Sequence, residues 1–294
     1  MTLGLIGLGR MGQSIVARLR QQGLPPPVVW DRDAAPIERA VAAGALAAQD
    51  AADVARRSDA VISIINDDAG ALRLFNGAAG VWSADVAGKL FIEMSTLRPA
   101  TVQALAQQAE VHGARLVGAP VMGSIPTVRD GQLFVLAGGH ADDVARAQTV
   151  LAPLARRVLH LGPAGAGNAM KLAVNLSMGA YLQALSEGLA LGMAQGLDLA
   201  QMLEVLGEAP TANGWLKAKL PVLQGGSSET TLDIVSLRKD IMSAVATGAG
   251  DGVAMPLASG LLAALSAAVA TGGGGLDLAQ LPRLFREQMR QREA

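Results

Sequence analysis

Three glycines near the start of the chain constrain its fold more than any other feature. Gly7, Gly9 and Gly12 form a GxGxxG pattern directly after the apolar run Leu3–Ile6, which predicts a buried strand. An amphipathic stretch over residues 13–20 follows them. The first glycine permits a tight strand-to-helix turn, the second lets a ligand approach the backbone, and the third lets the helix pack closely on the strand. The pattern therefore predicts a helix N-terminus that binds the phosphates of a dinucleotide.

A second predicted strand indicates how the ribose of that nucleotide is bound. The apolar run over residues 28–30 ends at Asp31, about 20 residues past the last glycine. The Asp31 carboxylate can accept hydrogen bonds from both ribose hydroxyls, which favours NAD, whereas Arg32 could pair with the 2′-phosphate of NADP. We expect both cofactors to bind, with a slight preference for NAD. The residues expected to hold the nucleotide are Gly7, Leu8, Gly9, Arg10, Met11, Gly12, Asp31 and Arg32.

Strands and helices alternate through the first half of the chain. The strands expected lie at residues 3–6, 28–31, 59–65, 89–94, 115–118, 133–137 and 157–161. Such alternation predicts a doubly wound, mostly parallel sheet with helices on both faces. The strand pattern stops after Leu161, and a glycine-rich turn over 162–167 precedes a pattern that is helical almost to the end. We therefore expect an α/β domain over residues 1–163 and an all-α domain over 164–294.

Composition argues against nucleic-acid binding, cysteine chemistry, a membrane span and a metal site. A net charge of −1 argues against nucleic acid, and the absence of cysteine excludes thiolate chemistry and fits a cytoplasmic protein. Residues 252–276 carry no charge, but they are rich in alanine and glycine and contain Pro256, so we expect a helix buried in a core or subunit interface rather than a membrane span. No metal site is expected, because no ligand spacing is found among His112, His140 and His160.

Lys171 is the most unusual charge in the chain. The helical pattern that begins at Asn168 is apolar nearly all round, which predicts burial, and Lys171 and Asn175 are spaced i,i+4 on one face. Burial and a helix N-terminus each lower the pKa of a lysine, which would suit a proton donor and acceptor. Alternatively, Lys171 buries only its aliphatic stem and Asn175 is a satisfied polar group. The spacing leaves both interpretations open.

Four blocks of sequence resemble the β-hydroxyacid dehydrogenase family, which includes 3-hydroxyisobutyrate dehydrogenase, tartronate semialdehyde reductase and, more distantly, 6-phosphogluconate dehydrogenase. The blocks are residues 4–12, residues 93–99 together with 118–124, residues 162–175 and residues 237–240. They follow the order of the family and extend over nearly the whole chain. The resemblance implies a Rossmann-type doubly wound sheet followed by an all-α C-terminal domain.

The resemblance also implies an activity and a set of roles. Lys171 would be the catalytic lysine, and Asn175 would help to hold the lysine and the substrate. The reaction would be NAD(P)-dependent hydride transfer on a small 3-hydroxyacid or the corresponding semialdehyde. Further cofactor contacts would be Ile65, Asn66, Thr96 and Lys239. The expected partners are this substrate and other copies of the chain, as a homodimer or homotetramer through the helical domain, with no nucleic acid and no membrane.

The segment Pro120–Ser124 departs from the family pattern. The family usually has a serine where this chain has Met122, and methionine cannot hydrogen-bond a substrate carboxylate as serine does. The backbone N–H groups of Gly123 and Ser124 are still expected to contact the substrate. The change therefore favours a less polar substrate, although Met122 could simply fill the turn.

Two alternative functions are kept open, an imine reductase on the same scaffold and a non-catalytic nucleotide-binding protein. Both kinds of relative commonly lack the catalytic lysine, so the presence of Lys171 with Asn175 argues against them. Trp215 could line the substrate pocket or belong to the core.

Overall fold

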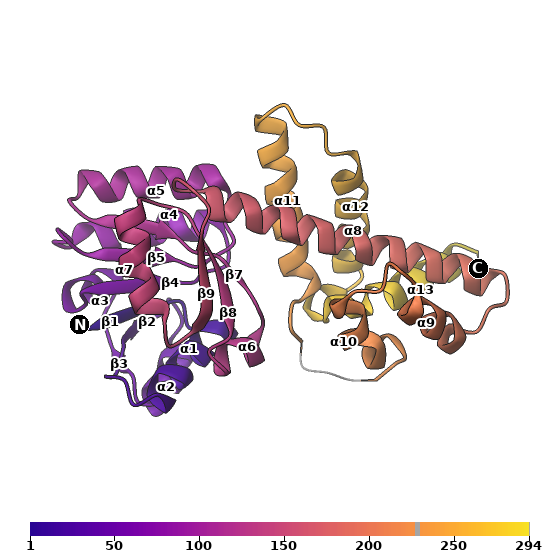
Figure 1. Ribbon diagram of the computed structural model, residues 1–294, viewed down its shortest axis with the longest axis horizontal. Helices are drawn as coiled ribbons and strands as arrows, with labels where there is room; N and C mark the ends of the chain where they lie inside the picture. Colours follow the sequence, from indigo (N-terminus) through magenta and orange to yellow (C-terminus); the bar gives the residue numbers. More distant parts are fainter. Residues whose placement is uncertain (227–229, 294) are drawn as a thin grey trace. The chain divides into compact units, whose positions relative to one another are not determined.

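The computed structural model describes residues 1–226 and 230–293, and it divides into two compact units, Met1–Leu172 and Ala173–Ala294 (Figure 1). The first unit combines two sheets with helices, and the described part of the second is helical. The division falls inside the long helix α8 (Ala166–Ala194). The domain boundary expected after residue 163 stays a prediction.

Six parallel strands form the main sheet of the first unit, in the order β3-β2-β1-β4-β5-β6. These strands are β1 (Leu3–Ile6), β2 (Val28–Trp30), β3 (Leu46–Ala47), β4 (Ala60–Ser63), β5 (Leu90–Glu93) and β6 (Arg115–Gly118). The predicted doubly wound parallel sheet is confirmed. The order reverses between β1 and β4, and in such sheets ligands bind beyond the carboxyl ends of the strands at that reversal.

A second, three-stranded sheet completes the strands of this unit. It contains β7 (Val121–Met122), β8 (Leu133–Ala137) and β9 (Ala155–His160), with β7 antiparallel and β9 parallel to β8. The sequence did not predict β3 or β7, because two residues are too few to show a strand periodicity.

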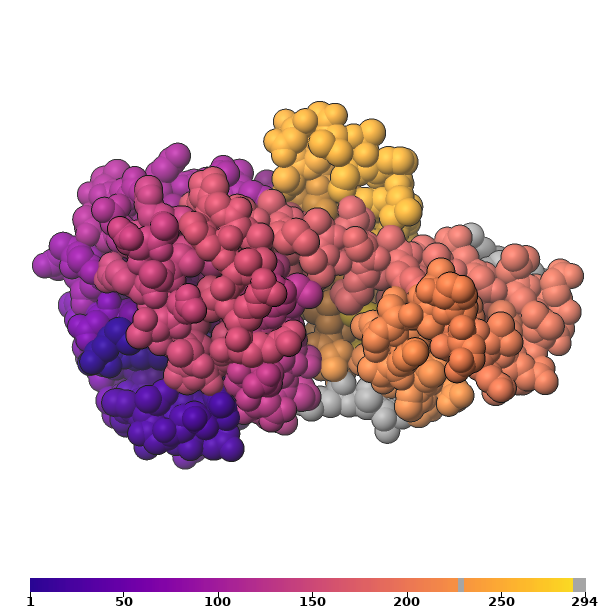
Figure 2. All heavy atoms as spheres, viewed as in Figure 1, coloured from indigo at the N-terminus to yellow at the C-terminus, as the bar shows by residue number. Residues whose placement is uncertain are grey.

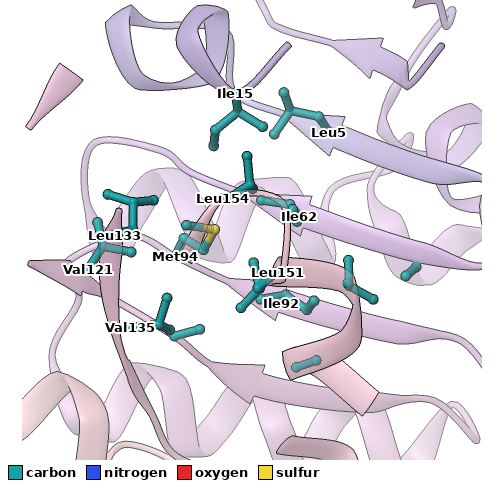
Figure 3. Packing of buried hydrophobic residues seen from close by; sticks show 14 of the residues in the cluster. Leu5, Ile15, Ile62, Ile92, Met94, Val121, Leu133, Val135, Leu151 and Leu154 are labelled. Carbon is teal, nitrogen blue, oxygen red and sulfur yellow. The ribbon is translucent and has the colours of Figure 1, made fainter. Parts of the chain in front are cut away.

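Helices cover the main sheet. They are α1 (Arg10–Gln21), α2 (Ala34–Ala42), α3 (Ala51–Arg57), α4 (Asp68–Asn76), α5 (Pro99–Val111), α6 (Ile125–Arg129) and α7 (Ala141–Leu151), with a 3-10 turn η1 (Val81–Ser83). Consecutive strand residues enter different cores, as period-two alternation requires: Leu5 belongs to one apolar cluster and Ile6 to the other. The same holds for Val61 and Ile62. Figure 3 shows the first cluster, which both sheets line through Leu5, Ile62, Ile92, Val121, Leu133 and Val135.

The second unit is helical, as predicted. After α8 come α9 (Leu199–Glu208), α10 (Gly214–Leu223), α11 (Ile234–Gly250), α12 (Pro256–Ala270) and α13 (Leu281–Glu293), with 3-10 turns η2 (Gly273–Gly275) and η3 (Leu278–Gln280). The side chains of Asp198, Asn213 and Asp233 accept N–H bonds at the starts of α9, α10 and α11, which satisfies backbone donors that a helix cannot pair internally.

The uncharged segment 252–276 contains α12 and η2, and one face of α12 enters the helical core through Leu261 and Leu265. Within the described residues, no helix combines the length and the apolar character needed to cross a membrane. The expected burial of α8 is incomplete, since Met170 and Leu191 are 44% and 68% exposed. A helix that is apolar all round has more apolar surface than its neighbours in one chain cover. Trp215 is partly buried against two apolar clusters, with its ring edge-on to Tyr181.

A buried ion pair joins three segments of the second unit. Lys219 Nζ on α10 lies 2.9 Å from Asp277 Oδ2, and both side chains are less than 10% exposed. The N–H and hydroxyl of Thr231 donate to the same oxygen, and the N–H of Ala279 donates to Oδ1. Burial raises the pKa of Asp277, but the hydrogen bonds and the Lys219 charge outweigh it, so the net pKa lies below the ordinary value.

Asp277→Ala is expected to lower the free energy of unfolding by about 3–5 kcal/mol, because it leaves the Lys219 ammonium buried without a counter-charge. Since the folded-state pKa is depressed, the contribution of the wild-type pair is complete above the ordinary aspartate pKa and is lost as pH falls through the folded-state value. Guanidinium unfolding followed by circular dichroism at neutral and acidic pH measures both effects. The exposed pair Arg283–Glu287 provides the control, and Glu287→Ala should cost less than about 1 kcal/mol. Equal losses in the two variants would contradict the assignment.

Candidate functional site

Two of the three fingerprint glycines are required by the fold itself. Gly7 has φ +93°, and a Cβ there would lie 2.0 Å from the carbonyl oxygen of Ile64. A Cβ on Gly12 would lie 2.0 Å from the carbonyl oxygen of Gly7, so the first turn of α1 packs directly on the end of β1. At Gly9, by contrast, a Cβ would meet no heavy atom of the described residues within 4 Å. The turn therefore leaves backbone at Gly9 open, which fits the close approach of a pyrophosphate.

Asp31, at the end of β2, is hydrogen-bonded to the backbone of this turn. Its Oδ2 accepts the N–H of Leu8 at 2.7 Å, and its Oδ1 accepts the N–H of Asp33 at 3.0 Å. Each carboxylate oxygen has a second lone pair, so these bonds leave acceptor capacity for ribose hydroxyls. The neighbouring Arg32 side chain is 75% exposed and pairs with Asp33 at 3.4 Å. Of the remaining residues in the turn, Arg10 is exposed and Met11 packs against the first apolar cluster.

The ends of β4 and β5 meet beside the same turn. The N–H of Ile65 donates to Ser95 Oγ at 2.8 Å, and the side chain of Ile65 lies next to Gly7. Asn66 is exposed and Thr96 is half-buried. The residues predicted to contact the nucleotide thus follow the ends of β1, β2, β4 and β5, and these ends lie at one edge of the sheet.

Glu93, at the end of β5, is a buried carboxyl that the sequence analysis did not assign. It accepts the N–H of Ser95 at 2.7 Å and the hydroxyl of Ser63. Burial raises its pKa, and the hydrogen bonds from Ser63 and Ser95 oppose that rise only in part. Glu93 therefore connects the end of β4 to the end of β5, directly before the loop that carries Thr96.

The turn at Met122 differs from the expectation in one respect. Met122 pairs with Phe134 across β7 and β8, and Gly123 has φ +144°. The N–H of Ser124, expected to be available to a substrate, donates to Thr127 Oγ1 at 3.2 Å in a capping box that starts α6. A substrate could use that N–H only by exchanging this bond.

The other predicted residues divide between the two units. Lys171 is half-buried on α8 in the first unit, and Asn175 follows one turn later in the second. The buried Asn175 donates from Nδ2 to Asp240 Oδ2 at 2.6 Å, and Lys239 Nζ lies 2.7 Å from Asp240 Oδ1. Asp240, only 4% exposed, therefore holds both predicted residues of the second unit.

The sequence could have pointed to Asp240, since it lies in the same block as Lys239. Its contact with Asn175, 65 residues away, could not be predicted from spacing. Within residues 1–226 and 230–293, no cluster of histidine, aspartate and glutamate is arranged to hold a metal ion.

Comparison with known proteins extends over both units. A family model described as the NAD binding domain of 6-phosphogluconate dehydrogenase matches residues 2–162, and one described as NAD-binding of NADP-dependent 3-hydroxyisobutyrate dehydrogenase matches residues 165–285. Glyoxylate/succinic semialdehyde reductase 1 of Arabidopsis thaliana is 31% identical over 94% of this chain and 96% of its own length. For 2-(hydroxymethyl)glutarate dehydrogenase of Eubacterium barkeri the identity is 28%, over 98% and 95%. The solved structure of Mycobacterium tuberculosis 3-hydroxyisobutyrate dehydrogenase with L-serine superimposes with a TM-score of 0.85 at 25% identity, covering 97% of this chain and 99% of that one.

Gly9→Ala should weaken NADH binding at least about tenfold, or about 1.4 kcal/mol, because its Cβ would occupy the open space proposed for the pyrophosphate. The melting temperature should change only by the small cost of alanine at the N-cap of α1. Gly12→Ala should instead lower the melting temperature, since its Cβ would collide with the Gly7 carbonyl. Fluorescence titration and thermal melts measure the two effects. Gly260→Ala, whose Cβ also meets open space but inside α12, is the control: it should leave NADH affinity unchanged and should not lower the melting temperature, because alanine favours a helix interior over glycine. Wild-type NADH affinity in Gly9→Ala would disprove the placement of the pyrophosphate.

Proposed function

Because the chain belongs to the β-hydroxyacid dehydrogenase family of NAD(P)-dependent oxidoreductases, we propose that it transfers a hydride between nicotinamide and a small 3-hydroxyacid or the corresponding semialdehyde, with Lys171 as the proton donor and acceptor. The observation that carries the proposal is that one compact unit contains both the dinucleotide turn and Lys171. The helix that bears the lysine continues into the second unit, where Asn175 is held by Asp240.

The residues at the strand ends fit a dinucleotide. The open backbone at Gly9 and the N-terminus of α1 would bind the pyrophosphate, and the Asp31 carboxylate would accept the ribose hydroxyls. Thr96 would lie beside the nicotinamide. When bound, the nicotinamide supplies or accepts the hydride at the substrate carbon.

Lys171 would move the proton that balances the hydride. In reduction its ammonium donates a proton to the carbonyl oxygen, and in oxidation the neutral amine accepts the hydroxyl proton. Asn175 would orient the lysine and the substrate, and its bond to Asp240 fixes its amide group. Lys239 would close over the cofactor, and Asp240 limits its position through their ion pair.

The turn at Met122 supports a substrate with a less polar end than a typical family substrate. Met122 provides no hydroxyl, and the N–H of Ser124 is already engaged by Thr127. Relatives named for glyoxylate, succinic semialdehyde and 2-(hydroxymethyl)glutarate set the range of compounds to be assayed. Cyclic imines belong in the same assay, because an imine reductase on this scaffold is the second candidate.

For the cofactor, we propose that both NAD and NADP are used, with NAD preferred. The support is the Asp31 carboxylate, which would repel a 2′-phosphate at close range. Arg32 is exposed beside it and could partly offset that repulsion.

We also propose a homodimer or homotetramer formed through the helical unit. An apolar groove of about 350 Å³ lies between α8 and α9, and Leu197 and Val205 at its lining are 56% and 70% exposed. Figure 2 shows α8 in salmon and α9 in orange at the surface of the molecule. Exposed apolar surface of this kind marks protein contacts in many proteins, and sedimentation of the purified chain measures the assembly.

Lys171→Ala should lower kcat by about 10²–10⁴, because general acid catalysis contributes about that much, and should leave NADH affinity close to wild type. Lys171→Arg should fail as well, since a guanidinium stays protonated and cannot shuttle a proton. Asn175→Ala should cost less than either. Stopped-flow or steady-state loss of NADH absorbance with semialdehydes, aldehydes and imines measures these effects.

The exposed Lys217 on α10 provides the matched control, and Lys217→Ala should retain wild-type kcat. A folded Lys171→Ala protein that keeps most of its kcat would overturn the role of the lysine. Turnover restricted to imines would favour the second candidate, and NADH binding with no turnover of any substrate would favour a non-catalytic protein.

Asp31→Asn should raise the ratio of kcat/KM for NADP over NAD by about tenfold, because it removes a negative charge beside the 2′-position while keeping the shape of the side chain. Asp142→Asn, which removes an exposed charge at the start of α7, is the control and should leave that ratio unchanged. An unchanged ratio in Asp31→Asn, or equal changes in both variants, would show that Asp31 does not contact the ribose.

A further inference from the structure

Ser95 is a junction at which three segments of the first unit meet. Its N–H donates to Glu93 at 2.7 Å, and its hydroxyl oxygen accepts the N–H of Ile65 at 2.8 Å. Its carbonyl oxygen accepts from Asn168 Nδ2 at 3.2 Å. Main-chain and side-chain groups of this one residue are thus all engaged, immediately before Thr96.

Asn168 supplies the connection from α8. It is completely buried, and its Nδ2 group donates to the carbonyl oxygen of Leu97 at 3.3 Å as well as to that of Ser95. Only the NH₂ end of the amide can face two carbonyl oxygens, so the orientation of the side chain is fixed by chemistry. The opposite atom, Oδ1, is buried with no hydrogen-bond partner among the residues that the structure describes.

Backbone packing brings the first turn of α8 to this place. A Cβ on Gly167 would lie 2.0 Å from the carbonyl oxygen of Leu136, and one on Gly138 would lie 2.6 Å from that of Pro163. A Cβ on Gly118 would lie 2.9 Å from Asn168 Oδ1. The glycines thus admit the helix against β6 and β8, whereas the two bonds from Asn168 fix it against the loop after β5.

We propose that Asn168 is a positioning residue for hydride transfer, one that fixes Lys171 on the first turns of α8 relative to Thr96 on the loop Ser95–Leu97. Lys171 follows Asn168 by three residues, less than one turn of helix, and Thr96 lies between the two carbonyl groups that Asn168 binds. This inference rests on the proposed roles of Lys171 and Thr96. The two donated bonds, to the carbonyl groups on either side of Thr96, are the observation that supports a role in positioning.

Two variants test the proposal. Asn168→Ala removes both donated bonds, and Asn168→Asp keeps the shape but places a carboxylate oxygen against two carbonyl oxygens. In both we expect kcat to fall at least about tenfold, with KM and the NADH dissociation constant within about threefold of wild type. The primary isotope effect with 4-deuterated NADH should rise, because a poorly aligned hydride transfer becomes rate-limiting.

Ser186→Ala is the matched control, since Ser186 is also completely buried on α8 but bonds only the Leu182 carbonyl within the helix. It should lower stability slightly and leave kcat and the isotope effect unchanged. Wild-type kcat in Asn168→Ala, or a loss shared equally by Ser186→Ala, would overturn the proposal.

A readout that does not need turnover separates this proposal from the proposed function. Hydrogen–deuterium exchange of the peptide covering residues 95–98 should be faster in Asn168→Ala than in wild type and unchanged in Ser186→Ala. If Lys171→Ala keeps its kcat, the proposed function fails. Faster exchange in Asn168→Ala would then show that Asn168 holds the loop but has no effect on catalysis, and this would overturn its positioning role. Unchanged exchange overturns the connection itself.

Discussion

The close approach of α1 to the end of β1 is the contact on which the arrangement of the neighbouring strand ends depends. Because a Cβ on Gly12 would lie 2.0 Å from the Gly7 carbonyl, only glycine permits the helix to begin where it does. That position aims the free N–H groups of the first turn of α1 past the open backbone at Gly9. It also leaves the N–H of Leu8 directed at Asp31, so the same turn places the carboxylate that we propose for the ribose.

Polar side chains then fix the neighbouring strand ends, which have no ladder partners beyond the sheet. Asp31 joins the end of β2 to the glycine turn, and Glu93 joins the ends of β4 and β5. Asn168 joins α8 to the loop that follows β5. Asp31 and Asn168 bond backbone groups, whereas Glu93 bonds the Ser63 hydroxyl as well as the Ser95 N–H. Such bonds order the loops through their polar groups. The residues expected to touch ligand, such as Thr96, lie between these fixed points.

What the sequence could predict here followed from local pattern. The glycine spacing, the strand–helix alternation and the helical second half predicted the two kinds of architecture, because each depends on neighbours in sequence. The short strands β3 and β7 were missed for lack of periodicity. The use of the Ser124 N–H by Thr127 was missed although a capping box has a local spacing. The contacts of Asn168 with Ser95 and of Asn175 with Asp240 span 73 and 65 residues, and no local pattern in the sequence indicates which distant residues will pair.

Comparing the glycines separates what the fold requires from what a ligand requires. Gly7 is fixed by its positive φ and Gly12 by contact with backbone, so their identity is explained within the protein. Gly9 has an ordinary extended conformation and free space around its missing Cβ, so neither strain nor packing accounts for it. A position where the protein alone would accept alanine, in a turn whose other glycines are obligatory, is best explained by a molecule that occupies that space.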